Sequence, residues 1–274
     1  MSSTTSVGPG IASSLRHLES RSFLTILLLG ALGWSLYNVN WGQSIVHTGG
    51  GSALVDLLRT LFTPELSPSF LKVAVEATWI TLAYAVAGIS LAIGIGLCLG
   101  VVASGVLARP GKKRRAVMVG TRLFLAVIRS IHELVWAWFF VVAIGLSPMA
   151  GILGLAIPYG GILGRIYADI LNDVRQEPLR ALRGAGASEW KVLFYGRLPM
   201  ALSDMLSYSF YRFECAIRAA AIMGFVGIRG LGLQIQLSLD DLLFGEMWTL
   251  LFFLIALVMS VDAWSSLLRK RLVR

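Results

Sequence analysis

Two long apolar segments each carry a group of ionisable side chains, and these are the residues whose types and spacing could do chemistry. One segment holds Arg129, His132 and Glu133, and the other holds Tyr211, Arg212, Glu214 and Arg218. Arginine stays charged at physiological pH and binds oxyanions through a planar fork of N–H donors. Because ionised groups inside a bilayer are costly, they usually face a partner or a water-filled cavity. These residues are therefore a candidate layer for contacting a small anion.

Spacing along each helix offers partners for these charges. Glu214 and Arg218 are four residues apart in the favoured orientation, and Arg129 and Glu133 have the same spacing in reverse. Three arginines against two glutamates leave one net positive charge. The pairs could simply hold the helices together, or the layer could line a pathway for an oxyanion. The sequence leaves both interpretations open.

Arg129 and Arg212 are expected at the same depth. Each lies 12 residues beyond the start of its apolar run, near Val117 and Met200 respectively. At about 1.5 Å per helical residue this is about 18 Å. Since the hydrocarbon core of a bilayer is about 30 Å thick, both side chains should lie near its centre.

Catalytic and metal-binding patterns are missing from the sequence. It contains no G-x-x-x-x-G-K-[ST] phosphate loop. The three histidines are scattered, and Cys98 and Cys215 lie in apolar runs without the spacing of metal ligands. We expect no catalytic residue, no metal site and no cofactor in this chain.

Six apolar runs must position the charged residues. Hydrophobic residues make up 56% of the chain and charged residues 14%, against about 25% charged in soluble domains. This composition predicts an all-α integral membrane protein with spans near residues 23–37, 73–106, 117–146, 149–170, 199–226 and 246–268. The first run also fits a signal peptide, but no small-residue cleavage site follows it, so we favour an uncleaved span. Gly96 and Gly100 in the second run predict a helix-packing face.

A short helix is predicted on the membrane surface near residues 53–62. Leu54, Leu57, Leu58 and Leu61 recur at helical spacing. Glycines precede this stretch and prolines follow it, which makes it too broken to span. An amphipathic helix lying in the interface fits this pattern.

Basic residues predict the orientation. If the N-terminus is cytoplasmic, sixteen of the 24 Lys and Arg residues lie inside and three outside. The chain then divides into a cytoplasmic N-terminal tail (1–21), a first span with an external segment (22–72), a five-helix core (73–268) with a cytoplasmic loop (171–198), and a basic cytoplasmic tail (269–274). Because the basic residues lie between apolar runs, the net charge of +9 indicates topology and contact with anionic lipid rather than nucleic acid.

The cytoplasmic loop has a helical pattern. Glu177 and Pro178 predict a helix start, and Gly184 and Gly186 predict its end. Ser188 is expected to cap a second short helix from Glu189 to Gly196. Glycine at 186 would permit the sharp turn between the two.

This loop resembles the coupling loop of ABC importer permeases. Ala181, Gly186, Leu198 and Pro199 match its signature in identity and spacing, whereas Arg180 and Leu182 depart from it in the way that phosphonate-type permeases do. Other segments resemble the same subfamily, namely Arg129 to Ala137, Ser207-Tyr208, Tyr211 to Glu214, Arg218 to Ala220, and Gly224 to Gly227 with Gly230 and Gly232. The resemblance covers roughly Leu66 to the C-terminus.

The resemblance implies a six-helix type I ABC importer permease in the bacterial cytoplasmic membrane. Its expected partners are a second copy of the chain, two cytoplasmic ABC ATPases that bind ATP and magnesium, and an extracytoplasmic substrate-binding protein. Its expected substrates are phosphonates, phosphite or related oxyanions. The residues expected to couple the chain to the ATPase are Glu177, Arg180, Ala181, Arg183, Gly186, Ala187, Ser188 and Pro199.

Two other functions stay open from the sequence. One is an amino-acid or methionine-type ABC permease, against which the arginines of the third and fifth spans argue. The other is a membrane enzyme that holds lipid-linked phosphates with the same arginines.

Overall fold

The computed structural model describes residues 10–39, 50–108 and 111–272, and it divides into two units, residues 1–55 and 56–274. The first unit contains the helix α1 (Gly10–Asn38). The predicted N-terminal tail falls partly on residues 1–9, and Arg109 and Arg274 of the basic clusters also lie outside the described residues.

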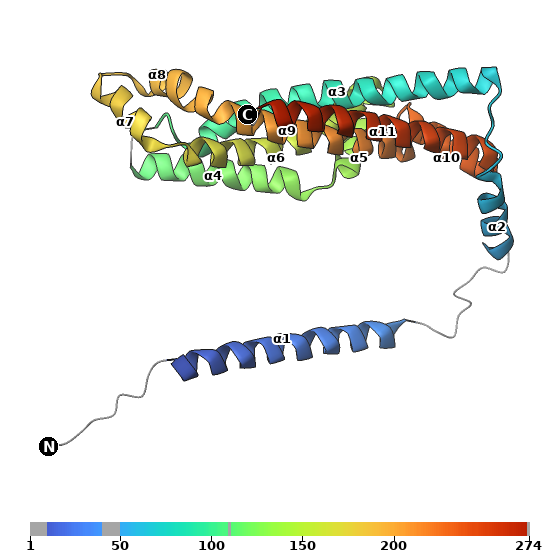
Figure 1. Cartoon of the computed structure of the whole chain (residues 1–274), viewed down its shortest axis with the longest axis horizontal. Helices are drawn as coiled ribbons and strands as arrows, with labels where there is room; N and C mark the ends of the chain where they lie inside the picture. The colour runs from blue at the N-terminus through green and yellow to red at the C-terminus, as the bar shows by residue number, and fades with distance from the viewer. Residues whose placement is uncertain (1–9, 40–49, 109–110, 273–274) are drawn as a thin grey trace. The chain divides into compact units, whose positions relative to one another are not determined.

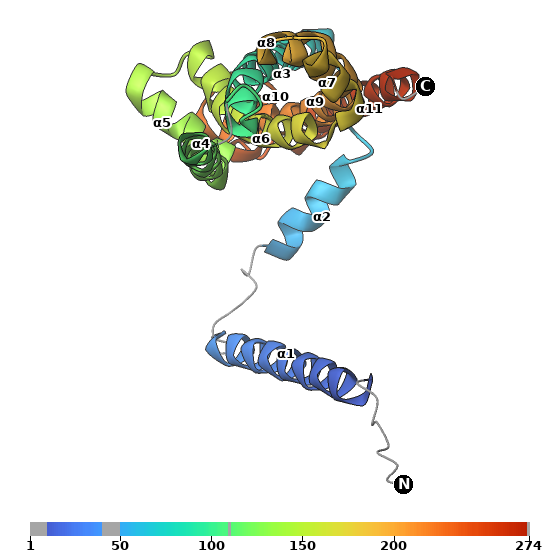
Figure 2. The same cartoon turned by 90° about the vertical axis from the view of Figure 1, so that its left-hand side faces the viewer.

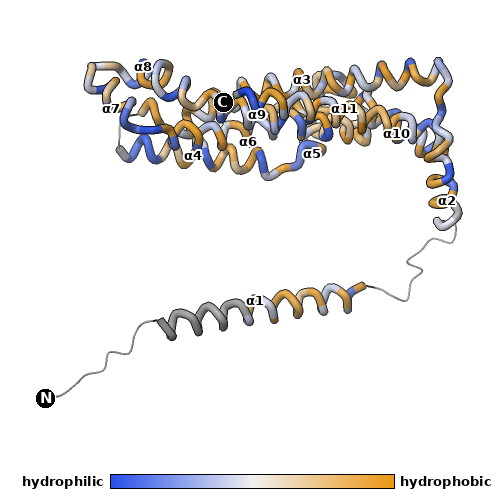
Figure 3. Tube along the Cα trace, viewed as in Figure 1, coloured by the Kyte–Doolittle hydropathy of each residue, from blue (hydrophilic) through white to orange (hydrophobic). Residues whose placement is uncertain are grey.

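The second unit is a helical bundle built on four long helices: α3 (Pro68–Ser104), α6 (Pro148–Asp173), α9 (Leu198–Ile222) and α11 (Phe244–Leu272). They run lengthwise side by side (Figure 1). Viewed end-on, helices α4 (Lys112–Ser130) and α5 (Glu133–Ile144) lie at one edge of the bundle and α11 lies at the opposite edge (Figure 2). Figure 3 shows hydrophobic residues along most of these helices.

Small residues bring α3 and α6 together at the centre. A Cβ atom on Gly96 would lie 2.7 Å from Leu163 Cβ, and one on Gly100 would lie 2.9 Å from Tyr167 Cβ. Both distances are too short for a side chain, so the backbones approach closely because these positions are glycine. The predicted packing face at Gly96 and Gly100 is confirmed.

The described helices include three that are long and apolar enough to cross a membrane: α3, α6 and α11. The number rises to five if each of two bent helix pairs counts as one span, and Ser22–Asn38 in the first unit is a shorter apolar helix. The number six and the positions of the termini stay predictions.

The span predicted over residues 117–146 is not a single straight helix. The chain breaks after Ser130, and α4 and α5 meet at an angle of 86°. His132 caps α5, since its Nδ1 accepts a hydrogen bond from the Leu134 amide at 3.3 Å. Trp136 Nε1 donates to the Ile128 carbonyl at 3.2 Å across the corner. A polar side chain can therefore end one helix and begin the next inside an apolar run.

A glycine-rich turn joins α9 to α10 (Leu231–Asp240) through a short 3₁₀ helix, Met223–Val226. Gly232 packs so closely that a Cβ atom there would overlap the Ala221 carbonyl oxygen. Thr81 of α3 accepts a hydrogen bond from the Leu231 amide at 2.9 Å. The turn is thereby fixed to the centre of the bundle.

The predicted amphipathic helix is present as α2 (Gly50–Thr60). Its Leu57 carbonyl accepts a hydrogen bond from Trp248 Nε1 of α11 at 2.8 Å. A position on the membrane surface stays a prediction. At the other end of α11, the helix continues to Leu272, so the first residues of the predicted basic tail are helical.

Candidate functional site

Arg129 and Arg212 line one cavity of about 520 Å³. Three helices form it. Residues Ala126, Arg129 and Ser130 come from α4, Ile162 and Ile166 from α6, and Tyr208 and Arg212 from α9. The structure therefore brings together the two arginines that the sequence placed at equal depth.

The Arg212 side chain is held by two tyrosines. Its Nη2 and Nε donate hydrogen bonds to the Tyr208 hydroxyl at 2.6 and 3.0 Å. The guanidinium carbon also lies 5.2 Å from the centre of the Tyr208 ring and 5.4 Å from that of Tyr211. Tyr208 was absent from the predicted site, although its position four residues before Arg212 places it on the same helix face.

Arg129 has no hydrogen-bond or ion-pair partner within the described part of the chain, and its side chain is exposed. Arg129 is thus a second guanidinium in the cavity of Arg212, and it is unpaired there. The two positive charges make the cavity cationic. Guanidinium groups bind carboxylates and phosphates through paired hydrogen bonds. The cavity can therefore attract a small oxyanion.

The two ion pairs that helical spacing made available do not form in the structure. Glu214 lies 2.9 Å from Arg269 of α11, not with Arg218. Arg218 instead approaches the Cys215 sulfur at 3.6 Å. Glu133 lies 3.7 Å from its neighbour His132 rather than with Arg129. Helix packing puts Glu214 against α11, and the bend after Ser130 separates Arg129 from Glu133, so local spacing does not decide these partners.

A second charge cluster was missed from the sequence. Asp169 of α6 pairs with Arg165 at 3.0 Å and with Arg122 of α4 at 3.3 Å. Arg122 also donates to the Ala103 carbonyl at the end of α3, at 3.1 Å. The four-residue spacing of Arg165 and Asp169 could have indicated the first pair, but the second joins distant helices.

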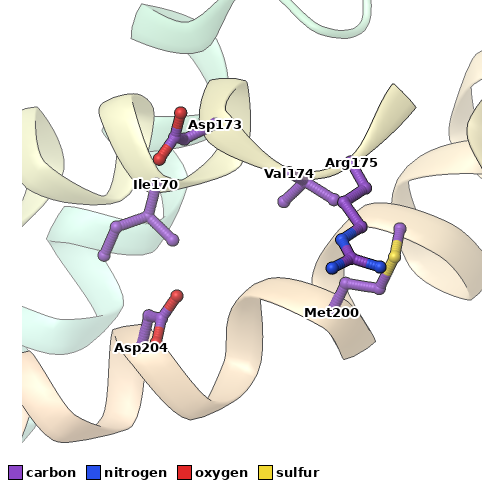
Figure 4. A pocket seen from close by; sticks show the side chains of 6 residues that line it. All are labelled: Ile170, Asp173, Val174, Arg175, Met200 and Asp204. Carbon is purple, nitrogen blue, oxygen red and sulfur yellow. The ribbon is translucent and has the colours of Figure 1, made fainter. Parts of the chain in front are cut away.

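The arginine cavity continues along α6 toward the predicted cytoplasmic loop. A cavity of about 490 Å³ shares Ile166 with it and is also lined by Asp169, Ile170, Asn172 and Asp173. A third, of about 350 Å³, shares Ile170 and Asp173 and adds Val174, Arg175, Met200 and Asp204 (Figure 4). The shared residues make these three cavities one groove, which we call the α6 groove.

The predicted coupling loop forms α7 (Gln176–Gly184) and α8 (Glu189–Lys191). Gly186 has φ of 82°, which confirms the sharp glycine turn. The second short helix does not end at Gly196 as predicted, because α8 runs through a π-helical segment, Val192–Arg197, directly into α9. Ser188 caps it weakly, with the Lys191 amide 3.5 Å from its hydroxyl.

Contacts within this loop fix one side of α7 and join the π-helical segment to the end of α6. Leu179 is fully buried, and a Cβ atom on Gly196 would lie 2.7 Å from its Cδ2. The buried Arg197 donates to the Leu171 carbonyl at 2.6 Å, at the end of α6. Neither Gly196 nor Arg197 was among the predicted coupling residues.

An ion pair closes the turn between α7 and α8. Arg183 donates two hydrogen bonds to the Glu189 carboxylate at 2.9 and 3.0 Å. These bonds hold the pKa of Glu189 below its ordinary value and raise that of Arg183. Glu177, Arg180 and Ala181 remain exposed on α7, together with Gly186, Ser188 and Pro199, while Ala187 is half-buried. Their contacts with an ATPase stay a prediction.

Residues 92–274 match the family described as binding-protein-dependent transport system inner membrane component. The match covers the groove and the loop together.

Three curated relatives are 29–33% identical to this chain over the matched residues. A phosphite transport system permease protein of Stutzerimonas stutzeri is 33% identical over 190 residues, 69% of this chain and 68% of the relative. A phosphate-import permease protein of Mycolicibacterium smegmatis is 31% identical over 78% of this chain but only 40% of its own length. A putative phosphite transport system permease protein of Stutzerimonas stutzeri is 29% identical over 94% of this chain and 88% of the relative.

Solved structures share the fold. A chain of the inward-facing MetNI methionine ABC transporter has a TM-score of 0.67 at 23% identity, over 76% of this chain and all of that one. A chain of an amino acid ABC transporter, crystallised with histidines, has a TM-score of 0.62 at 16% identity, over 74% of this chain and 95% of its own. At these identities the likeness concerns the fold alone.

Proposed function

Because the chain belongs to the family of binding-protein-dependent transport system inner membrane components, we propose that it carries a small phosphorus oxyanion, such as phosphite or a phosphonate, across the bacterial cytoplasmic membrane. It is a multi-pass inner-membrane transport subunit and not an enzyme. The substrate class is supported by the relatives, which are named for phosphite and phosphate transport.

The observation that carries this proposal is the cavity shared by Arg129 and Arg212. One guanidinium is fixed by Tyr208 and the other is unpaired among the described residues. One fixed and one unpaired cation in the same cavity suit an oxyanion that must bind and then leave. The amino-acid and methionine alternative rests on structures too distant in sequence to indicate a substrate.

An importer permease of this family works with an ATPase and a substrate-binding protein. We propose that two copies of this chain face each other, so that two α6 grooves line one pathway. Two ATPases would bind on the cytoplasmic side, at the coupling loops. ATP and magnesium would be bound by the ATPase, and this chain would hold no cofactor of its own.

The exposed side of α7 is the proposed contact with the ATPase. Glu177, Arg180 and Ala181 lie on it, and Leu179 fixes the opposite side to the bundle through Gly196. Because α8 continues into α9, which carries Arg212, movement of the loop would reach the arginine cavity through one continuous helix.

Transport by cells that carry Arg212→Gln tests the proposal. We expect uptake of phosphite and methylphosphonate to fall at least tenfold, while the variant still assembles and co-purifies with its ATPase. The matched control is Arg271→Gln at the exposed end of α11, which should transport normally. Normal uptake by Arg212→Gln, or no uptake of either compound by the unaltered transporter, would contradict the proposal.

A further inference from the structure

We propose that the α6 groove carries a descending series of charge, and that Asp173 and Asp204 at its cytoplasmic end promote release of the oxyanion by weakening its binding. This inference rests on the proposed function. It adds residues that change the affinity of the arginine cavity without contacting the arginines.

Three levels of charge follow one another along the groove. The first contains Arg129 and Arg212 and has two positive charges. The second contains Asp169 and Asp173, and the two arginines that pair with Asp169 bring its net charge to zero. The third shares Asp173 and adds Asp204 and Arg175, which leaves one negative charge. The charge therefore changes sign between the arginine cavity and the coupling loop.

The distances between the levels are short enough for the charges to interact. On α9, Asp204, Tyr208 and Arg212 follow one another at four-residue intervals, so Asp204 and Arg212 are about 12 Å apart along the helix axis. That separation is about one and a half times the screening length of about 8 Å at physiological salt, so salt weakens the repulsion at the arginine cavity without removing it. The carboxylates act most strongly on an anion that moves toward the cytoplasm.

Asp173 and Asp204 are free to act in this way. Their carboxylates have no hydrogen-bond or ion-pair partner within the described residues, and both residues are exposed. They stand on α6 and α9, on opposite sides of the cavity, with Arg175 at the helix end beside Met200 (Figure 4). Asp169 differs, because two arginines neutralise it. An anion that leaves the arginine cavity toward the coupling loop therefore passes these unpaired carboxylates at the end of the groove.

Electrostatic repulsion at the last level has a functional use. A cationic cavity open to the cytoplasm would retain the imported oxyanion and would also bind oxyanions already there. The net negative charge at the cytoplasmic end of the groove lowers both affinities without changing the arginines. A carboxylate at the distance of Asp204 should weaken binding by about twofold, because salt screens most of the repulsion from a like charge about 12 Å away.

The test measures weak binding in the assembled permease–ATPase complex without nucleotide, in nanodiscs. Methylphosphonate is titrated and its ³¹P resonance is followed. Asp173→Asn with Asp204→Asn should tighten binding about two- to fourfold, and each single change should give a smaller shift. The matched control is Asp240→Asn with Asp241→Asn, which removes two aspartates at the opposite end of the bundle (Figure 1). It should leave the dissociation constant unchanged.

A second double variant separates the effect of charge from the effect of a structural change. Asp173→Glu with Asp204→Glu keeps both charges and should bind methylphosphonate like the unaltered complex. If the glutamate variant tightens binding as much as the asparagine variant, or if the asparagine variant changes nothing, the inference is overturned.

Failure of the proposed function would look different. It would appear as no saturable binding by the unaltered complex, or as binding that Arg212→Gln leaves unchanged. An Arg212-dependent affinity that is indifferent to the carboxylates overturns the charge series alone.

Discussion

Glu214 of α9 and Arg269 of α11 form an ion pair at 2.9 Å, and the Glu214 side chain is only 11% exposed. The pair joins the helix that carries Arg212 to the C-terminal helix. Phe213, next to Glu214, packs edge-on against Trp264 of α11. The contact between these helices thus combines one nearly buried charge pair with aromatic packing.

Arg269→Gln should destabilise the protein by about 1–3 kcal/mol, because it leaves the Glu214 carboxylate without its partner. For a domain of this size the melting temperature should fall by several degrees. Thermal unfolding in detergent, followed by tryptophan fluorescence, measures this. Glu214→Gln with Arg269→Gln should recover part of the loss, and a double variant that is no more stable than the single one would contradict the assignment.

Tyr208→Phe should reduce oxyanion uptake about three- to tenfold. The change removes the hydroxyl that accepts two hydrogen bonds from Arg212 but keeps the ring beneath the guanidinium. Initial uptake rates measured over a range of substrate concentrations check it. Tyr195→Phe, at a side chain that is 77% exposed, is the matched control. Equal rates for the two variants would show that the hydroxyl does not position Arg212.

Gly186→Val should separate ATP hydrolysis from transport or prevent ATPase binding. Valine is strained at φ of 82°, so the turn between α7 and α8 must shift. Gly120→Val makes the same change on α4, where a Cβ atom would meet nothing within 4 Å. Uptake, ATPase rate and subunit ratio of the purified complex are compared. Normal uptake at normal stoichiometry in Gly186→Val argues against a coupling role.

The Arg183–Glu189 ion pair should slow hydrogen exchange in the turn between α7 and α8 at neutral pH. The hydrogen bonds from Arg183 hold the pKa of Glu189 below its ordinary value near 4.5. A lowered carboxyl pKa contributes stability that is present above the ordinary value and is lost as the pH falls through the folded value. Hydrogen exchange of residues 184–192, corrected for intrinsic rates, should stay slow from pH 7 down to about pH 4.5. Glu189→Gln should exchange faster at pH 7, and equal protection in both proteins would refute the role of the pair.

Single cysteines in a background without Cys98 and Cys215 test the orientation. Ser188 and Asp241 are exposed near opposite ends of the bundle. If the coupling loop is cytoplasmic, an impermeant thiol reagent added to intact cells should label Asp241→Cys and spare Ser188→Cys. The reverse pattern would overturn the predicted topology.

Composition and local pattern were enough to predict several features. The apolar runs gave α3, α6, α9 and α11 to within a few residues, because burial in lipid requires long stretches of hydrophobic helix. Gly96 and Gly100 predicted the α3–α6 contact, and the loop pattern predicted α7 and the turn at Gly186. Arg129 and Arg212, which the sequence placed equally far along their runs, line one cavity in the structure.

Only the tertiary structure decided which charges are partners. Glu214 pairs with Arg269 and Asp169 with Arg122, across gaps in sequence that no helical spacing describes. The bend after Ser130 and the continuous path from α8 into α9 were also invisible in the apolar pattern. The physical reason is that hydrophobicity and helical periodicity act along one helix, whereas a long charged side chain takes the nearest partner in space, and helix packing alone determines which partner that is.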